Sequence, residues 1–271
     1  MDDITVTRGG RDILRKVNWE VNEGEHWALI GGNGSGKTSL LKVLMGYLTP
    51  TDGEIDMPGR YSAIDSPDQE WDKWRKNIGF VSSSIAEMIE PAETALDVVM
   101  AGRHAMVNYW QKNAAVEKAD GEAARKILGK VNCSHLRDHP WAYLSQGERQ
   151  RLLIGRALMS PQLDALVLDE PCAGLDPVAR EHFLHFIQEL TGQKAFRSLV
   201  MVTHHVEEIF PNISHALIIR EGITVACGEK KDALTSRTIS DAFGGELKLR
   251  SRDGRYRISF GQDDIPAGQV V

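Results

Sequence analysis

The sequence contains few cysteines, and they are not arranged as a cross-linked or metal-binding framework. Cys133, Cys172 and Cys227 are its three cysteines, and no two of them form a Cys-x-x-Cys pair. This spacing argues against a disulfide scaffold and against a thiolate zinc site. We therefore expect reduced thiols that are buried as small apolar side chains.

Long apolar runs and an excess of positive charge are also missing. The longest apolar runs are four residues, for example Ala165–Leu168, whereas a membrane-spanning helix needs about 20 residues. The first residues, Met1-Asp2-Asp3, show no basic stretch followed by an apolar one, so no secretory signal is expected. A net charge of −6 argues against a general attraction to nucleic acid or anionic lipid. A cytoplasmic protein that does not cross a bilayer is expected.

The composition and the apolar pattern indicate a folded α/β protein. The chain has 271 residues, of which 42% are hydrophobic and 26% are charged, as in typical globular proteins. A helical region is expected from about residue 87 to residue 159, with a break at 132–140. Short strands separated by helix-length segments are expected elsewhere, at Ile4–Thr7, Val17–Val21, Trp27–Ile30, Ala165–Leu168, Leu199–Val202 and Ala216–Ile219.

A β-hairpin is expected near the end of the sequence, at 247–260. Apolar and polar residues alternate on both sides of Asp253-Gly254, and Asp-Gly is a strong two-residue turn signal. Such a turn pairs Leu247 with Phe260 and Leu249 with Ile258, so the apolar residues share one face. The other face is basic. A solvated surface, the protein's own acidic surface, a partner and nucleic acid are the alternatives for what it faces, and its residues are Lys248, Arg250, Arg252, Arg255 and Arg257.

A glycine-rich loop follows the apolar stretch Trp27–Ile30 and opens a helical pattern. Its residues fit Gly-x-x-x-x-Gly-Lys-Thr, the pattern of a loop that binds phosphate through convergent backbone N–H groups and a helix N-terminus. In that pattern Lys37 reaches the β- and γ-phosphates and Thr38 binds magnesium. A nucleoside triphosphate is the expected ligand, contacted by Gly31, Asn33, Gly34, Ser35, Gly36, Lys37, Thr38 and Ser39.

Two carboxylates, Asp169 and Glu170, follow the apolar strand Ala165–Leu168. Open α/β sheets bind ligands at the carboxyl ends of their strands. We expect Asp169 to hold magnesium and Glu170 to polarise the attacking water. The alternative is a capping pair before Pro171.

A second helix start has the features of an anion site. Ser145 and Glu148 have the Ser-x-x-Glu spacing of a capping box, within Leu144–Glu148. A cap alone would explain these residues, but a helix start with Ser and Gly also suits an anion. One chain with a complete phosphate loop has no evident use for a second site.

These segments together resemble the motifs of ABC-type ATPase domains. The resemblance covers about residues 2–230, and Leu-Ser-x-Gly-Glu is its most specific motif. It rests on Gly31–Thr38, Leu144–Glu148, Leu166–Glu170, Ala173–Asp176 and Thr203-His204.

The resemblance implies a fold and an assembly. The fold would be a P-loop NTPase core of the ABC ATPase type, with a mixed sheet, antiparallel N-terminal strands and an inserted helical subdomain. The assembly would be a head-to-tail homodimer with ATP between the glycine loop of one subunit and Ser145, Gln146 and Gly147 of the other. Asp176 would communicate between the sites, and His204 would contact the γ-phosphate and orient water. A structural histidine is the alternative for His204.

Two positions depart from the family pattern. The strand Ile78–Val81 is usually followed by a magnesium-binding glutamine, and Ser83 stands there instead, with Ser82 and Ser84 as alternatives. A serine hydroxyl can still bind magnesium directly or through water. The aromatic residue that stacks on adenine is replaced by Arg8, which either stacks through its guanidinium plane or is solvated.

Three other groups of residues have ordinary explanations. Cys133, His135 and His139 lack a fourth ligand for a metal site. His182 and His185 fit a helix surface, and Cys172 fits a small buried side chain better than a redox centre.

The expected function is that of the ATP-binding and ATP-hydrolysing subunit of an ABC transporter, with ATP and Mg²⁺ as cofactors. It would lie at the inner face of the cell membrane, powering separate membrane-spanning permease subunits, most simply of an importer. Nucleic acid is not expected as a partner. A soluble ABC ATPase of repair, translation or cofactor assembly is the alternative. The expected domains are an ATPase domain at 1–230, with a helical subdomain at about 87–159, and an extension at 231–271.

Overall fold

The computed structural model describes residues 1–56, 67–110 and 113–260. The chain separates into two compact units. Unit 1 comprises Met1–Ala63 and Val200–Val271, and unit 2 comprises Ile64–Leu199. In the parts of the chain that the structure describes, no helix has the length and apolar character needed to cross a membrane.

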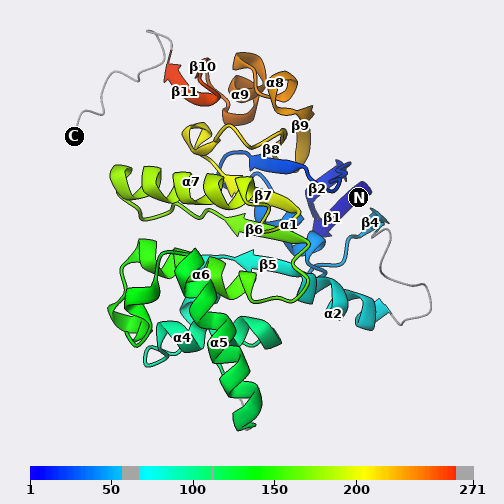
Figure 1. Cartoon of the computed structure of the whole chain (residues 1–271). Coiled ribbons are helices and arrows are strands. Elements are labelled where there is room, and N and C mark those ends of the chain that lie inside the picture. Colours follow the sequence, from blue (N-terminus) through cyan, green and yellow to red (C-terminus); the bar gives the residue numbers. More distant parts are fainter. Residues whose placement is uncertain (57–66, 111–112, 261–271) are drawn as a thin grey trace. The chain divides into compact units, whose positions relative to one another are not determined.

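Unit 1 contains most of the strands (Figure 1). One sheet has the order β2-β1-β4, and another has the order β7-β3-β8-β9 within this unit, where β7 contributes residues 200–203. The pair β3–β8 is parallel and the pair β8–β9 is antiparallel. The strands are β1 (Asp2–Arg8), β2 (Arg11–Val17), β3 (His26–Ile30), β4 (Asp52–Glu54), β7 (Ser198–Thr203), β8 (His215–Arg220) and β9 (Ile223–Glu229).

The helices of unit 1 are short. Helix α1 (Lys37–Leu44) follows the glycine loop, as expected, and buries Leu40, Leu41 and Val43. Helices α8 (Lys230–Ala233) and α9 (Ser236–Phe243) follow β9, and the turn η4 (Val206–Glu208) follows β7. The stretch between β7 and β8 is long enough for a helix, as the sequence indicates, and it contains the short turn η4.

The hairpin of β10 (Leu247–Arg252) and β11 (Arg255–Phe260) has the predicted register. Leu247 pairs with Phe260, Leu249 with Ile258, and Arg250 with Arg257. The side chains of Leu247 and Tyr256 are buried, which identifies the apolar face. On the basic face, Lys248, Arg250, Arg252 and Arg257 are exposed and Arg255 is half-buried.

Unit 2 combines a parallel strand pair with helices. Strands β5 (Ile78–Val81) and β6 (Ala165–Asp169) are parallel neighbours, and helices α4, α5 and α6 pack together (Figure 1). Asn113 caps α5, and Asp176 caps α7 with Pro177 at its first position. The helices are α2 (Pro67–Asn77), α3 (Ser83–Met88), α4 (Ala95–Ala101), α5 (Ala114–Lys130), α6 (Gln146–Leu158) and α7 (Pro177–Gly192), with short turns η1 (Gly102–His104), η2 (Ser134–Leu136) and η3 (Trp141–Tyr143).

Two sequence predictions were wrong. The strand expected at Val17–Val21 lies earlier, because β2 ends at Val17. The expectation that all thiols are buried holds for Cys133 and Cys172, but Cys227 is exposed on β9. Strand β9 lies at an edge of its sheet, where a side chain has neighbours on fewer sides.

Candidate functional site

The phosphate loop (Gly31–Thr38) lies in unit 1 and joins β3 to α1. Gly31 packs closely against its surroundings, since a Cβ there would lie 2.3 Å from the Ile219 carbonyl oxygen. Gly36 is the N-cap of α1 with φ of 108°, a left-handed conformation that favours glycine. As a glycine, this N-cap residue makes no side-chain cap hydrogen bond. It therefore offers no side-chain acceptor to the first N–H groups of the helix.

Lys37 adds a positive charge to the same loop. Its Nζ donates hydrogen bonds to the carbonyl oxygens of Gly31 (2.8 Å) and Gly32 (2.9 Å), and its side chain is buried. An ammonium group and an uncapped helix N-terminus together favour an anion such as phosphate. Asn33, Gly34 and Thr38 are exposed and Ser39 is half-buried, whereas Ser35 is buried. The loop residues therefore fit the phosphate groups of a nucleotide.

Backbone hydrogen bonds hold the phosphate loop in place. The Gly222 N–H donates to the Ser35 carbonyl (2.8 Å), and the Arg15 N–H donates to the Gly222 carbonyl (2.8 Å). The turn between β8 and β9 thus connects the loop to β2. Arg8 is exposed at the end of β1, where its Cα pairs with that of Arg11. Stacking of Arg8 on adenine stays a prediction.

His204 also lies in unit 1, directly after β7, which neighbours β3. Its ring is 4.1 Å from the His205 ring, measured between centroids, and the residue is half-buried. The preceding residue, Thr203, donates its hydroxyl to Glu208 (2.6 Å) and accepts a hydrogen bond from the His205 N–H (2.9 Å). These bonds fold the backbone on both sides of His204 into a turn.

In unit 2, two of the three predicted magnesium-binding residues lie at the ends of two neighbouring parallel strands. Val81 of β5 pairs with Leu168 of β6. Asp169 is the last residue of β6 and Ser83 lies two residues after β5; both therefore lie at the sheet edge where these parallel strands end. Ser82 is buried and its hydroxyl caps α3 by accepting from the Ile85 N–H (3.4 Å). Ser83 is exposed, so its hydroxyl is the better placed of the two for a ligand.

Glu170 has a conformation that is unusual for its residue type. Its φ is 47°, in the left-handed region, where a non-glycine residue costs about 1–2 kcal/mol. The Ala173 N–H donates to the Glu170 carbonyl (3.1 Å), so the turn after β6 holds this conformation. Backbone strain of this kind is frequent at functional sites. Glu170 is half-buried, as is Asp169.

The signature segment (Leu144–Glu148) forms the predicted capping box at the start of α6. The Ser145 hydroxyl accepts from the Glu148 N–H (3.4 Å), and Glu148 Oε2 accepts from the Ser145 N–H (2.8 Å). The loop that precedes α7 lies against this helix start, because a Cβ at Gly147 would lie 3.8 Å from the Leu175 side chain. In the same loop, Asp176 accepts from the Val178 and Ala179 N–H groups (2.8 and 2.9 Å).

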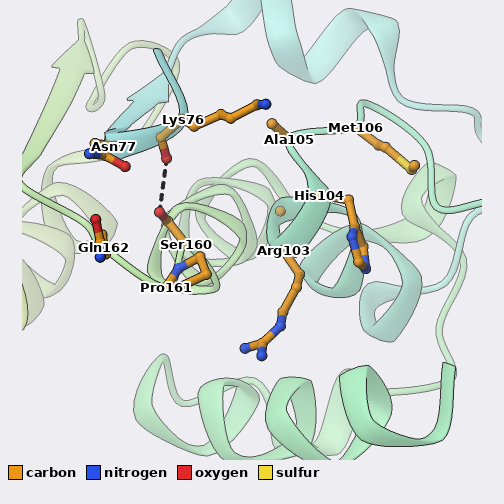
Figure 2. Close-up of a pocket in the computed structure, with 10 residues that line it drawn as sticks. Lys76, Asn77, Arg103, His104, Ala105, Met106, Ser160, Pro161 and Gln162 are labelled. Carbon is orange, nitrogen blue, oxygen red and sulfur yellow. Dashed lines mark hydrogen bonds between the residues drawn. The ribbon is translucent and has the colours of Figure 1, made fainter. Parts of the chain in front are cut away.

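A pocket of about 590 Å³ in unit 2 was not predicted from the sequence. Figure 2 shows its walls, where Ser160 donates a hydrogen bond to the Lys76 carbonyl (2.9 Å). Basic residues come from two sides of it, namely Lys76 and the pair Arg103 and His104. The lining residues are Lys76, Asn77, Gly102–Met106 and Ser160–Gln162.

A buried carboxylate supports one side of this pocket. Asp120 of α5 is 3% exposed and contacts His104 Nε2 (2.6 Å) and Arg103 Nε (3.5 Å). Tyr109 donates its hydroxyl to the same carboxylate (3.0 Å), and burial together with this bond raises the Tyr109 pKa. A polar residue among the apolar positions of α5 is the only signal of this cluster in the sequence.

The remaining cysteines and histidines noted in the sequence are ordinary buried or surface residues. Within the described residues, no cluster of three or more His, Cys, Asp or Glu side chains suits a metal ion. Cys133 is buried, and burial raises its pKa to about 11, so its thiol is protonated at neutral pH. Cys172 is buried, and His182 and His185 are exposed on α7.

Comparison with known proteins agrees with these motifs. The family model described as "ABC transporter" matches residues 14–173. An uncharacterized ABC transporter ATP-binding protein, YlmA of Bacillus subtilis, is 36% identical over 90% of this chain and 89% of its own length. A putative ABC transporter ATP-binding protein of Streptococcus mutans is 34% identical, covering 94% and 95%.

The fold matches as well. A solved structure, an inward-facing conformation of a putative metal-chelate type ABC transporter, superposes with a TM-score of 0.75 at 24% identity, covering 95% of this chain and 94% of that one. The family model spans more than half of the sequence, and the two relatives cover nearly all of it. The chain therefore belongs to the ABC transporter ATP-binding proteins and is an ATPase that hydrolyses ATP.

Proposed function

We propose that this ATPase is a subunit of an ABC importer that docks on separate membrane-spanning permease subunits and works as a head-to-tail homodimer. The observation that carries the dimer is the presence of two anion-suited helix starts in one chain. The start of α1 has no side-chain cap and carries Lys37, and the start of α6 carries Ser145 and Gly147. In a head-to-tail dimer, the phosphate loop of each subunit would face the signature segment of the other, so both helix starts would contact nucleotide.

The residues of each site would divide the work as follows. Lys37, the loop N–H groups and Ser145 with Gln146 and Gly147 of the other subunit would bind the triphosphate. Glu170 would accept a proton from the attacking water, and His204 would orient that water against the γ-phosphate. Asp176 would lie between the two sites.

Magnesium would be held by oxygen donors. Thr38, Asp169 and Ser83 are hydroxyl and carboxylate groups, the ligand types that this ion prefers. The ion would neutralise charge on the β- and γ-phosphate oxygens during phosphoryl transfer. Asp169 ends β6 and Ser83 lies two residues after the neighbouring end of β5, which supports their joint role.

Mixing two inactive variants tests the dimer. Lys37→Ala inactivates the loop and Gly147→Asp inactivates the signature segment. In a heterodimer of the two, one site would combine both defects and the other would be intact. We expect ATPase activity to return on mixing, approaching one quarter of the wild-type rate per protomer under random exchange if each intact site acts independently. The matched control is a mixture in which both subunits carry Lys37→Ala. If mixing restores nothing while the subunits demonstrably exchange, the site lies within one chain and the proposal fails.

The relatives support an imported inorganic ion as cargo. The manganese transport system ATP-binding protein MntB of Bacillus subtilis is 28% identical over 91% of this chain. The zinc transport system ATP-binding protein TroB of Treponema pallidum and the molybdate import ATP-binding protein MolC of Haemophilus influenzae are each 27% identical. We propose an ion of this class as cargo, tested by the metal content of cells that lack the gene.

The permease contact would lie on unit 2. Met88 and Trp110 are 54% and 72% exposed. A hydrogen bond from the Glu90 N–H to Asn108 Oδ1 (2.9 Å) joins the segments that carry them. The segment before Trp110 also lines the pocket of Figure 2. Exposed apolar side chains in a unit that also carries a basic pocket suit a permease loop with apolar and acidic side chains.

Variants that place a negative charge at these positions test the contact, and the amount of protein recovered with membranes is the measured quantity. Met88→Glu and Trp110→Glu should leave the ATPase activity of the isolated protein unchanged and reduce its recovery with membranes from native cells. Tyr47→Glu, at a residue 63% exposed in unit 1, is the control. Wild-type protein found wholly in the soluble fraction would contradict the permease proposal. It would favour a soluble ABC ATPase, for which the basic hairpin and Ser83 are the supporting features.

A further inference from the structure

The C-terminal hairpin is joined to the segment that follows His204. We call residues 204–214 the His204 segment. Strand β11 packs on η4 within it, and the Ile258 N–H donates to Glu207 Oε1 (3.3 Å). The hairpin turn meets the same segment further along, since a Cβ at Gly254 would lie 3.1–3.4 Å from Pro211. Two points of the hairpin therefore rest on one stretch of chain.

The hairpin is itself held firmly on its other side. Helix α9 packs against β10. The Leu247 N–H donates to Ser240 Oγ (2.9 Å), and the Leu249 N–H donates to Ser236 Oγ (3.0 Å). Leu247 and Tyr256 are buried. The hairpin therefore packs on α9 on one side and on the His204 segment on the other.

Hydrogen bonds within and beside the His204 segment connect η4 to the residues on both sides of His204. Glu207 and Glu208 are adjacent in η4. Glu208 is 3% exposed and accepts the Thr203 hydroxyl (2.6 Å), and Thr203 in turn accepts the His205 N–H (2.9 Å). The hydrogen bond that Glu207 accepts from the Ile258 N–H joins this turn to the hairpin. A displaced η4 would therefore move the backbone that carries His204.

We propose that Glu207 is a positioning residue, through which the C-terminal hairpin fixes the backbone of η4 and so the orientation of His204 toward the bound nucleotide. The hairpin lies outside residues 14–173, the part matched by the family model. The inference rests on the proposed function, in which His204 orients the attacking water. It assigns a role in ATP hydrolysis to a part of the chain that the shared motifs do not include.

The test compares Glu207→Leu with Glu207→Gln. Leucine has a similar size and no acceptor, whereas glutamine keeps a side-chain oxygen for the Ile258 N–H. One hydrogen bond of ordinary net strength corresponds to a factor of about two to ten. We expect Glu207→Leu to lower kcat by that factor with the KM for ATP unchanged, and Glu207→Gln to keep the wild-type kcat. Arg250→Ala, on the exposed basic face of the hairpin, is the control and should change neither.

NMR and a double variant separate positioning from general destabilisation. The Cε1–Hε1 signal of the His204 ring should shift in Glu207→Leu and stay in place in Arg250→Ala, at a temperature where all variants are folded. Glu207→Leu should lower kcat no further in a His204→Ala background, because both changes act on one group. An unmoved ring signal together with additive effects on kcat would overturn the proposal.

The single variant His204→Ala distinguishes the proposed role of His204 in hydrolysis from the proposed positioning role of the hairpin. If this variant retains wild-type kcat, the proposed role of His204 is wrong. If it lowers kcat by about a hundredfold or more while Glu207→Leu changes nothing, His204 acts as proposed and the hairpin does not position it.

Discussion

Val81 of β5 lies opposite Leu168 of β6 in a parallel pair, and this register places the ends of both strands at one sheet edge. Asp169 is the last residue of β6 and Ser83 lies two residues after the end of β5, although 86 positions separate their numbers in the sequence. This relationship supports the proposal that Ser83 and Asp169 bind one metal ion, and substitution of Ser83 tests it.

Ser83→Ala should raise the magnesium concentration needed for half-maximal ATPase activity. Loss of one hydroxyl or water-mediated contact corresponds to a factor of about two to ten in affinity. A magnesium titration of ATP hydrolysis measures this change. Ser84→Ala, at the next exposed position of α3, is the matched control. Equal effects from the two substitutions would remove the specific role of Ser83.

Glu170→Gln should lower kcat by about a hundredfold or more, because a positioned general base contributes about 10²–10⁴ to the rate. Nucleotide binding should persist, since the amide keeps the size of the side chain and the phosphate loop is unchanged. Equilibrium binding of labelled ATP and steady-state hydrolysis measure the two quantities. Glu122→Gln, at an exposed position of α5, is the control. Normal turnover in Glu170→Gln would exclude Glu170 as the base.

Features defined by short-range sequence patterns could be predicted. The hairpin register follows from Asp253-Gly254 and the alternation on either side of it, and the α6 cap follows from Ser145 and Glu148. Strand β2 was misplaced because its charged residues, including Arg15 and Lys16, interrupt the alternation. Lys16 also has φ of 47°, and the pairing of β1 with β2 changes register between Ile4 and Val6. A local pattern of alternating residues does not reveal such irregular pairing.

Features made by tertiary contacts could not be predicted. The pocket of unit 2 gathers residues from three separate stretches, and the hairpin meets Glu207 across 51 positions. The motifs located the candidate site residues in the sequence, but they did not show that Glu170 has a left-handed backbone. That conformation depends on the turn that follows β6.

Among the three cysteines, Cys227 should be the one that reacts with a thiol reagent in the folded protein. Cys133 and Cys172 are buried and Cys227 is exposed. Partial burial of the sulfur and the carboxylate of Glu25 raise the Cys227 pKa above its ordinary value of 9.0. The thiolate is the reactive form, so a raised pKa makes labelling slow at neutral pH and faster as the pH rises past 9.0.

Mass spectrometry after labelling counts the modified thiols. Cys227→Ser should abolish labelling of the native protein, and urea should expose the other two. Labelling of two or three cysteines without denaturant would contradict the burial of Cys133 and Cys172.

Asp120→Ala should destabilise unit 2 more than substitution of a surface carboxylate. The side chain of Asp120 is 4% exposed and is paired with Arg103 and His104, while Tyr109 donates a third contact. Removing one partner of a buried ion pair costs about 3–5 kcal/mol. The side chains of Arg103 and His104 are 44% and 27% exposed, so water compensates them in part and a loss of about 2 kcal/mol is expected.

Urea unfolding of Asp120→Ala and Asp138→Ala provides the comparison, because Asp138 carries an exposed ion pair with Arg137. The midpoint should fall for the first variant and stay within error for the second. Asp120→Asn should lie between wild type and Asp120→Ala, since an amide can still accept the Tyr109 hydroxyl but carries no charge for Arg103. The pocket of Figure 2 is bounded by Arg103 and His104, so the same order of variants should appear in membrane recovery if the permease docks there. Equal midpoints for Asp120→Ala and Asp138→Ala would show that the Asp120 cluster does not hold this wall of the pocket.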